Sequence, residues 1–292
     1  MTNRAARKWY SCRPRRVEVT SPEGSEKLQK VLAESGRGSR REMEKWISAG
    51  RIEVNDDTAH LGQRVGPEDR IRVDGKPLPR KVSAASRVIL YNKPAGMVCT
   101  RRDPAGRPTV FDALPAIKQG RWISVGRLDI ATTGCLLLTT DGELANRMMH
   151  PSTGLDREYA VRINGTLTPA QLEQATTGVP SEGEMLSFSD IRYYDGSGTN
   201  HWYHVVLLEG RNREIRRLFA AFGLSVSRLK RVRFGPVLLP SRLLRGRLSE
   251  LSSADVHKLK KILKLPSRKP KGKQKHGAKT PSVLIAYPEL KA

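Results

Sequence analysis

Residues 125–142 read VGRLDIATTGCLLLTTDG, and they combine a candidate reactive group with the pattern of a buried strand. The continuous apolar run at 135–139 predicts that strand. Asp129 lies just before it, in a polar loop bounded by glycines. A carboxylate on a loop between rigid elements is a candidate nucleophile or acid–base group. A loop aspartate also commonly braces a turn or pairs with a neighbour, here Arg127, so this stretch alone leaves both interpretations open.

The composition indicates several domains and a polyanionic partner. The chain has 292 residues, of which 38% are hydrophobic, and this length suits two or three domains. Lysine and arginine number 53 against 29 acidic residues, which gives a net charge of +24 and a pI near 10.4. Such an imbalance favours polyanions through long-range attraction and counterion release. RNA and an anionic membrane surface both fit the charge.

The sequence contains no pattern typical of a membrane span, a secretory signal or a metal site. No apolar stretch approaches the length of a spanning helix, and no apolar segment follows the first basic residues. Glu18 and Glu23 also disfavour an organellar transit peptide. Cys12, Cys99 and Cys135 are far apart and odd in number, which suits a reducing compartment. We therefore expect a cytoplasmic monomer that needs no membrane, metal or cofactor.

Changes in composition predict four segments along the chain. Residues 1–24 are basic and non-periodic, as in a flexible arm. Residues 25–84 contain two short helices, a few short strands and a linker, and Ser39-Arg40-Arg41-Glu42 predicts a capping box on the second helix. Residues 85–256 form a larger domain. Residues 257–292 form a basic tail, in which the lysine-rich run from Arg268 is expected to be disordered.

The sequence pattern of the larger domain predicts an α+β fold. Strand patterns at 88–91, 97–100, 158–163, 203–207 and 226–234 are separated by turns and by occasional helices. Asp141 can cap a helix that ends before Pro151. A second, amphipathic helix follows Gly210, with Ile215 and Leu218 on its apolar face. This arrangement favours a mixed, mainly antiparallel sheet over a doubly wound parallel one.

Two groups of basic residues and one tyrosine are candidates for RNA contact. The helix pair of the small domain carries the first group, although a solvated helix face explains its charge equally well. Arg213, Arg216 and Arg217 share a helix with an apolar face, and one of them could pair with a buried acid and keep it ionised. Tyr159 is either a half-buried strand aromatic or a group that stacks on an extruded base. The first group is Lys27, Lys30, Arg37, Arg40, Arg41, Lys45 and Arg51.

Four motifs resemble, in order, those of the RsuA/RluB group of RNA pseudouridine synthases. Residues 25 to about 75 resemble the small RNA-binding domain with an alpha-L motif that precedes the catalytic domain in this group. Cys135 departs from the group, which usually has leucine there. The motifs are Tyr91-Asn92-Lys93-Pro94-Ala95-Gly96, Gly126-Arg127-Leu128-Asp129 with Thr132-Thr133-Gly134, Arg157-Glu158-Tyr159, and Gly210-Arg211-Asn212-Arg213-Glu214-Ile215-Arg216-Arg217-Leu218.

The resemblance implies site-specific isomerisation of uridine to pseudouridine, without cofactor or metal. Further stretches, such as residues 106–112, are most similar to members that act on large-subunit (23S) rRNA or its assembly intermediates. Asp129 would be the nucleophile, attacking either the sugar or the base, and Arg216 its salt-bridge partner. Tyr159 would stack on the target and assist proton removal. RNA contacts would come from the small domain and from Lys93, Arg127, Arg213 and Arg217.

Two alternatives remain open at this point. The same enzyme class could act on small-subunit rRNA or on another large-subunit site. A non-catalytic RNA-binding factor for ribosome assembly could also use a synthase fold that has lost its activity. The presence of Asp129, Tyr159 and Arg216 argues against the second alternative.

Overall fold

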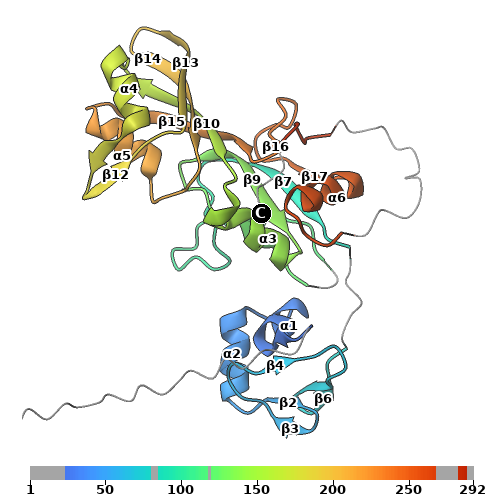
Figure 1. Ribbon diagram of the computed structural model, residues 1–292. Helices are drawn as coiled ribbons and strands as arrows, with labels where there is room; N and C mark the ends of the chain where they lie inside the picture. The colour runs from blue at the N-terminus through green and yellow to red at the C-terminus, as the bar shows by residue number, and fades with distance from the viewer. Residues whose placement is uncertain (1–23, 80–84, 118–119, 268–281, 288–292) are drawn as a thin grey trace, which may run out of the picture. The chain divides into compact units, whose positions relative to one another are not determined.

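The chain forms two compact units, Met1–Arg80 and Lys81–Ala292 (Figure 1). The structure is a computed structural model that describes residues 24–79, 85–117, 120–267 and 282–287. The arm expected at 1–24 lies outside these residues except for Gly24, and so does the lysine-rich run that begins at Arg268. Each unit has its own hydrophobic core, so each is treated by itself below.

The small unit packs two helices against short strands around one core. Its four-stranded sheet has the order β3-β2-β5-β6, and β1 pairs with β4. The predicted capping box is confirmed: the Glu42 amide donates to Ser39 Oγ at 3.1 Å, and the Ser39 amide donates to Glu42 Oε2 at 3.3 Å. The elements are β1 (Glu26–Lys27), α1 (Leu28–Glu34), α2 (Arg40–Ser48), β2 (Ile52–Val54), β3 (Asp57–Thr58), β4 (Arg64–Val65), β5 (Ile71–Val73) and β6 (Lys76–Pro77).

The larger unit is built on a nine-stranded sheet with the path β13-β14-β10-β15-β9-β7-β17. Strand β8 pairs with β9 and β16 with β15, and every pairing is antiparallel except β15 with β9. The predicted α+β class with a mixed, mainly antiparallel sheet is confirmed. The strands are β7 (Val88–Lys93), β8 (Ile123–Val125), β9 (Thr133–Thr139), β10 (Arg157–Asn164), β11 (Val179–Ser181), β12 (Glu184–Leu186), β13 (Asp190–Ser197), β14 (Asn200–Leu207), β15 (Val226–Phe234), β16 (Val237–Leu238) and β17 (Leu248–Glu250).

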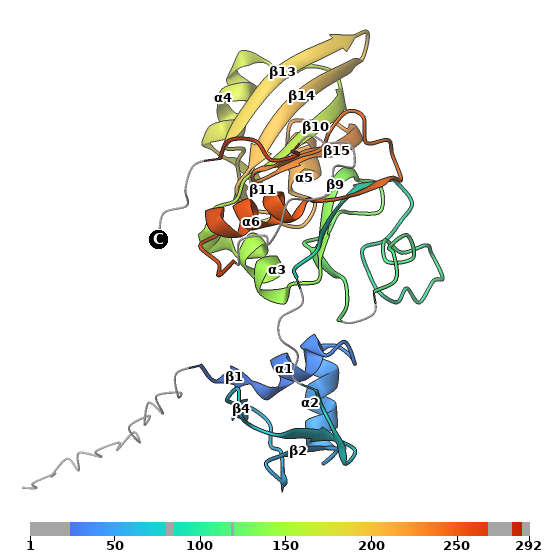
Figure 2. The same cartoon turned by 90° about the vertical axis from the view of Figure 1, so that its right-hand side faces the viewer.

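Helices cover opposite faces of the sheet at its two ends (Figure 2). Along β9 the side chains alternate between two cores: Leu136 and Leu138 belong to the core that contains Val110 and Trp122, whereas Cys135 and Leu137 belong to the core on the other face, which contains residues of α3 and α6. This two-sided burial explains the continuous apolar run in the sequence. The helices are α3 (Gly142–Met149), the 3₁₀ turn η1 (Pro151–Thr153), α4 (Pro169–Thr177), α5 (Glu214–Ala221) and α6 (Ser253–Ile262).

Three expectations about elements and boundaries were wrong. Residues 97–100 are not a strand, and only Val98 makes an isolated bridge, to Thr109. The boundary after residue 256 falls inside α6, whose apolar side is part of the core. Residues 282–287 also return to the larger unit, where Val283 is buried and its carbonyl accepts from the Leu238 amide at 2.9 Å. Core packing therefore extends into the segment expected to be a tail.

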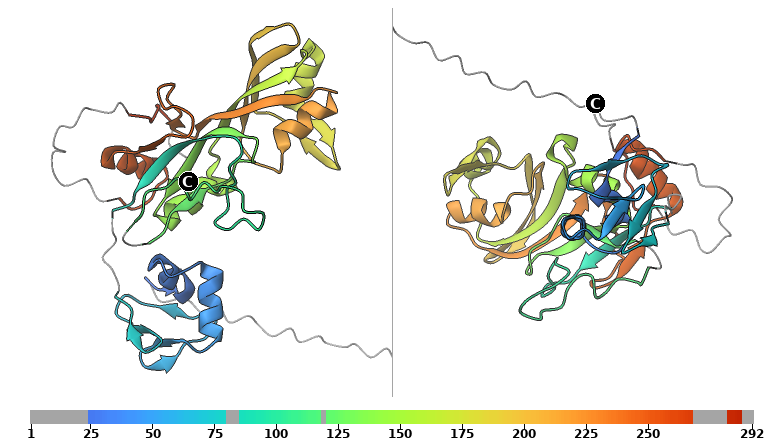
Figure 3. Two further views of the ribbon diagram at one scale, coloured as in Figure 1. Left: turned by 180° about the vertical axis from the view of Figure 1, so that it is seen from behind. Right: turned by 90° about the horizontal axis from the view of Figure 1, so that it is seen from below.

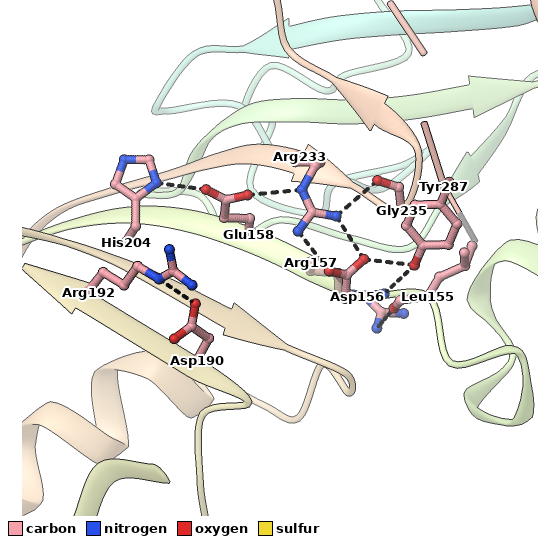
Figure 4. A network of polar contacts seen from close by, with 10 residues as sticks. All are labelled: Leu155, Asp156, Arg157, Glu158, Asp190, Arg192, His204, Arg233, Gly235 and Tyr287. Carbon is pink, nitrogen blue, oxygen red and sulfur yellow. Dashed lines mark hydrogen bonds and ion pairs between the residues drawn. The ribbon is translucent and has the colours of Figure 1, made fainter. Parts of the chain in front are cut away.

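A network of ion pairs joins β10, β15 and the returning segment (Figure 4). The Arg233 guanidinium makes two hydrogen bonds to Asp156, at 2.8 and 2.7 Å, and a third to Glu158 at 2.9 Å. Tyr287 donates its hydroxyl to Asp156 at 2.8 Å, and His204 Nδ1 lies 2.7 Å from Glu158 Oε1. Burial alone would raise the pKa of Asp156 and of Glu158, but these partners outweigh it and hold both pKa values below their ordinary range.

These depressed pKa values predict a loss of stability in acid. A carboxylate with a lowered folded-state pKa stabilises the fold above its unfolded pKa, and this contribution disappears as the pH falls towards the folded pKa. We expect the free energy of unfolding to decline below about pH 5.

Arg233→Met should lower the free energy of unfolding by about 3 kcal/mol at pH 7 and should make its decline in acid less steep. Arg192→Met removes the exposed pair with Asp190 and should cost less than about 1 kcal/mol. Urea denaturation of both variants at pH 7 and pH 4 measures these changes in the free energy of unfolding. Equal decreases in the two variants would contradict a stabilising role of the Arg233 network.

Gly134 lies where the parallel strands β9 and β15 meet, opposite Arg231. Its φ is +100°, a conformation that side-chain-bearing residues rarely adopt. A Cβ built on Gly134 would overlap the main-chain oxygen of Arg231. The junction between the two halves of the sheet therefore requires glycine at this position.

Gly134→Ala should lower the free energy of unfolding by about 3 kcal/mol or more, because both the backbone conformation and the close approach become unfavourable. Gly142→Ala is the matched control: it lies at the start of α3, and a Cβ there would meet only Ile123 Cδ1, at 3.5 Å. The control should change stability by less than about 1 kcal/mol. Urea denaturation of the two variants measures the difference. Similar denaturation midpoints would argue against a close approach of the β9 and β15 backbones at Gly134.

Candidate active site

A pocket of about 1170 Å³ in the larger unit brings together the three residues expected to be catalytic. Asp129 comes from the loop between β8 and β9, Tyr159 from β10 and Arg216 from α5. The loop at 98–107 contributes further lining residues. The volume is large enough for a nucleotide, since small-molecule pockets commonly have several hundred Å³.

Lys93 holds the loop that carries Asp129. Its side chain is fully buried, and Nζ donates to the carbonyl oxygens of Pro94 at 3.0 Å, Asp129 at 3.1 Å and Thr132 at 3.0 Å. Burial lowers the pKa of Lys93, and the nearby negative charge of Asp129 opposes that shift. The Asp129 backbone is thus fixed while its side chain remains exposed in the pocket. The expectation that Lys93 binds RNA was wrong, because the ammonium is enclosed by main-chain carbonyls.

Arg216 lines the same pocket as Asp129 without forming an ion pair with it. Among the described residues no ion pair within 4.0 Å involves Asp129, so the expected salt bridge is absent. Arg216 Nη1 donates to the Val226 carbonyl at 2.8 Å, while its buried Nε has no partner among the described groups. Burial and the neighbouring Arg213 lower the pKa of Arg216, whereas the charge of Asp129 raises it. The guanidinium therefore contributes positive charge near the candidate nucleophile, while its buried Nε remains unpaired.

Tyr159 is anchored in the sheet beside the pocket. It is 8% exposed and pairs across the sheet with Val205 on β14 and Arg231 on β15. Its ring belongs to the hydrophobic core that also contains Leu229 and Ile215. A ring held in this way offers a rigid apolar surface against which a planar base can pack.

Two further predicted residues, Arg127 and Arg213, are exposed at the pocket. Arg213 is the N-cap of α5 and has a φ of +48°, a left-handed conformation that is uncommon for arginine. Such strained residues often occur at functional sites. Both guanidinium groups are placed where phosphates of a polyanionic substrate could reach them.

Arg217 does not face the pocket and is already neutralised. Its guanidinium pairs with Glu182 at 2.9 Å and Glu184 at 3.0 Å, and it donates to the Ser181 carbonyl at 2.8 Å. These contacts fasten α5 to the β11–β12 hairpin. The expectation that Arg217 binds RNA was therefore wrong, because its charge is used within the protein.

Four arginines that the sequence analysis did not select as site residues also line the pocket: Arg107, Arg157, Arg211 and Arg231. Arg231 is 2% exposed, and its Nε donates to the Cys135 carbonyl at 2.7 Å. Arg157 donates to the carbonyls of Leu155 at 3.0 Å and Leu208 at 2.6 Å. A signal existed for Arg231, since it shares the inward side of β15 with Leu229, where strand alternation predicts an apolar residue.

The basic residues predicted on the small unit are mostly exposed. Lys30 is half-buried, pairs with Glu26 and lies 4.0 Å from Glu34, and the exposed Arg51 is paired with Asp74. This pairing reduces the charge that Lys30 and Arg51 can offer to a phosphate. The exposed members of the predicted set are Lys27, Arg37, Arg40, Arg41, Lys45 and Arg51.

Within the described part of the chain, no group of three or more His, Cys, Asp or Glu side chains is arranged to hold a metal ion. The helices described at 24–79, 85–117, 120–267 and 282–287 include none with the length and apolar character needed to cross a membrane.

Two known domain families match the chain in the order of its two units. The S4 domain matches residues 26–71, and the RNA pseudouridylate synthase domain matches residues 87–221. The second match contains Asp129, Tyr159 and Arg216. A solved structure described as a pseudouridylate synthase, 26% identical, aligns with a TM-score of 0.56 over 80% of this chain and 99% of its own.

Curated relatives extend the likeness over most of the chain. Ribosomal large subunit pseudouridine synthase B of Escherichia coli K12 is 52% identical over 83% of this chain and 84% of its own length. The protein of the same name from Pseudomonas aeruginosa is 58% identical over 79% of this chain, and the match spans 61% of that longer relative. The corresponding protein of Vibrio cholerae is 50% identical. The chain therefore belongs to the RNA pseudouridine synthase family, in the RsuA/RluB group that carries an S4 domain before the catalytic domain.

Proposed function

We propose that the protein isomerises a specific uridine of large-subunit rRNA to pseudouridine, with Asp129 as the nucleophile. The observation that carries this proposal is the exposed Asp129 carboxylate on a fixed backbone, in a pocket shared with Tyr159 and Arg216. The large-subunit target is supported by relatives of 50–58% identity that are named for that subunit.

The reaction breaks the bond between C1′ and the base nitrogen and forms a bond from C1′ to a ring carbon. The atoms of substrate and product are the same, so no co-reactant is consumed. A nucleophilic carboxylate divides the exchange into two easier steps through a covalent intermediate. The carbon that bonds to the sugar must then lose its proton, and Tyr159 is the group in the pocket proposed to assist.

The target uridine must leave its stack before Asp129 can reach it. Flipping a nucleotide out of a helix costs a few kcal/mol, which contacts remote from the chemistry can supply. Tyr159 would pack against the extruded base, and Arg127 and Arg213 would contact flanking phosphates. Arg216 lines the pocket, and its positive charge would favour the bound nucleotide with its phosphate.

We further propose that the protein acts on ribosomal RNA as a monomer in the cytoplasm. The compartment follows from the rRNA substrate named in the relatives. The monomer is supported by the pocket, to which a single chain contributes Asp129, Tyr159 and Arg216. The basic surface of the small unit would add affinity that depends on salt.

Asp129→Asn should abolish pseudouridine formation, because the amide is not a nucleophile of comparable strength. We expect the single-turnover rate to fall by at least about 10⁴-fold while RNA binding is kept. The assay incubates purified protein with unmodified large-subunit rRNA and maps pseudouridine by carbodiimide treatment and primer extension. Asp190→Asn, an equivalent change at a carboxylate paired with Arg192 outside the pocket, serves as the control.

One new primer-extension stop with wild type and with Asp190→Asn, and none with Asp129→Asn, is the expected result. A stop in small-subunit rRNA alone would contradict the target. Failure of the wild-type protein to modify either RNA would contradict the enzymatic proposal and favour a ribosome-assembly factor.

A further inference from the structure

The four strands β13, β14, β10 and β15 present one sheet face that no described helix covers (Figures 2 and 3). Helices α4 and α5 pack on the opposite face, against Val161, Val205 and Leu229. Strand alternation therefore turns the neighbours of these residues outward. The register places Trp202, Arg162 and Arg228 in one row across the sheet, and His204, Ala160 and Lys230 in the next row.

Aromatic rings gather on this outward face. Tyr194 lies at the irregularity in the pairing of β13 with β14 and is 72% exposed, which is unusual for a tyrosine without a partner molecule. Its ring centroid is 5.3 Å from that of His204, and the Arg162 guanidinium lies 6.0 Å from the Trp202 ring. Glu158 holds the His204 ring in place (Figure 4). Ala160 lies between His204 and Lys230 across the sheet, and its small side chain makes this part of the face shallow.

The charge of the outward face is positive and partly unpaired. No described residue forms a hydrogen bond or an ion pair with the side chain of Arg228 or Lys230. Two acidic residues at this part of the sheet are already engaged, Glu158 with Arg233 and His204, and Asp190 with Arg192. A third, Asp195, lies opposite Trp202, is exposed, and accepts only from the Gly196 amide among the described residues. Two free cations therefore lie beside the exposed Tyr194 ring and the partly exposed Trp202 ring, and they outnumber the one unpaired carboxylate, Asp195.

Exposed rings alternating with cations on a sheet suit single-stranded RNA. Bases stack on aromatic side chains with little regard to sequence, and lysine and arginine contact the phosphates between them. A protein partner would require a larger aliphatic surface at its centre than this face offers. The aromatic side chains and the positive charge therefore both favour single-stranded RNA as the ligand of this face.

We propose that the outward face of β13, β14, β10 and β15 binds a single-stranded stretch of the substrate RNA away from the target uridine. Tyr194 and Trp202 stack on bases, while Arg162, Arg228 and Lys230 contact phosphates. Tyr159 points to the other side of the same sheet, so the RNA held here is distinct from the nucleotide in the pocket. The proposal rests on the proposed function only in taking RNA as the substrate.

The test measures binding of a fluorescein-labelled, unstructured 20-nucleotide RNA to the full chain by fluorescence anisotropy. The double variant Tyr194→Ala, Arg228→Glu should bind about ten-fold more weakly, since one stacked base and one phosphate contact are lost. The magnitude of the salt dependence of log K should decrease by about 1. The matched control is Tyr193→Ala, Lys258→Glu, which removes a tyrosine ring packed on Tyr203 and reverses an exposed charge on α6. It should bind within about two-fold of wild type.

A second measurement does not depend on the variants. Photo-crosslinking of wild-type protein to a 4-thiouridine RNA, followed by peptide mapping, should mark Tyr194 or Trp202. Unchanged affinity of the double variant, or crosslinks confined to the pocket and the small unit, would overturn the proposal and leave a protein as the partner of this face. Both readouts are independent of catalysis. An inactive enzyme that still crosslinks at β13 and β14 would contradict the proposed function and support this site.

Discussion

The candidate active site depends on one buried ammonium group. Lys93 ends β7 inside the sheet and binds the main-chain carbonyls of the loop that carries Asp129. Burying a cation without a carboxylate partner costs free energy, and the four carbonyl oxygens around Nζ offset that cost only if the loop keeps its shape. The Gly96 amide adds a hydrogen bond to the Ile130 carbonyl at 2.8 Å. The loop is thus held through its backbone, which leaves the Asp129 carboxylate available for chemistry.

The arginines and lysines of the larger unit divide into two roles. Lys93, Arg217 and Arg233 are enclosed by carbonyls or carboxylates and hold elements together. Arg127 and Arg213 are exposed at the pocket, so they can meet a substrate. A net charge of +24 therefore overstates the surface available to RNA. Burial and pairing, rather than charge alone, decide which cations can contact a phosphate.

The sequence predicted the fold class, the capping box and the buried strand at 135–139 because each follows from local pattern. It could not predict the environment of a charged side chain. The motif containing Lys93 looks like a basic surface turn until the carbonyls of residues 129–132, distant in sequence, enclose the ammonium. The expected ion pair of Arg216 with Asp129 is also absent among the described residues, where Arg216 donates to the Val226 carbonyl. The packing of α6 and of residues 282–287 in the core also depends on contacts distant in sequence, which the local pattern did not indicate.

The central claim is that Lys93 positions the Asp129 loop and does not bind RNA. Lys93→Met keeps much of the apolar stem and removes the four hydrogen bonds to the carbonyls of Pro94, Asp129, Ile130 and Thr132. We measure its single-turnover rate on unmodified rRNA, its RNA affinity, and hydrogen exchange of the amides at 128–132. The account predicts faster exchange in this loop, with β9 still protected, and a rate reduced by at least about 100-fold at unchanged affinity. Weaker RNA binding with unchanged exchange and an unchanged rate at saturating enzyme would contradict it.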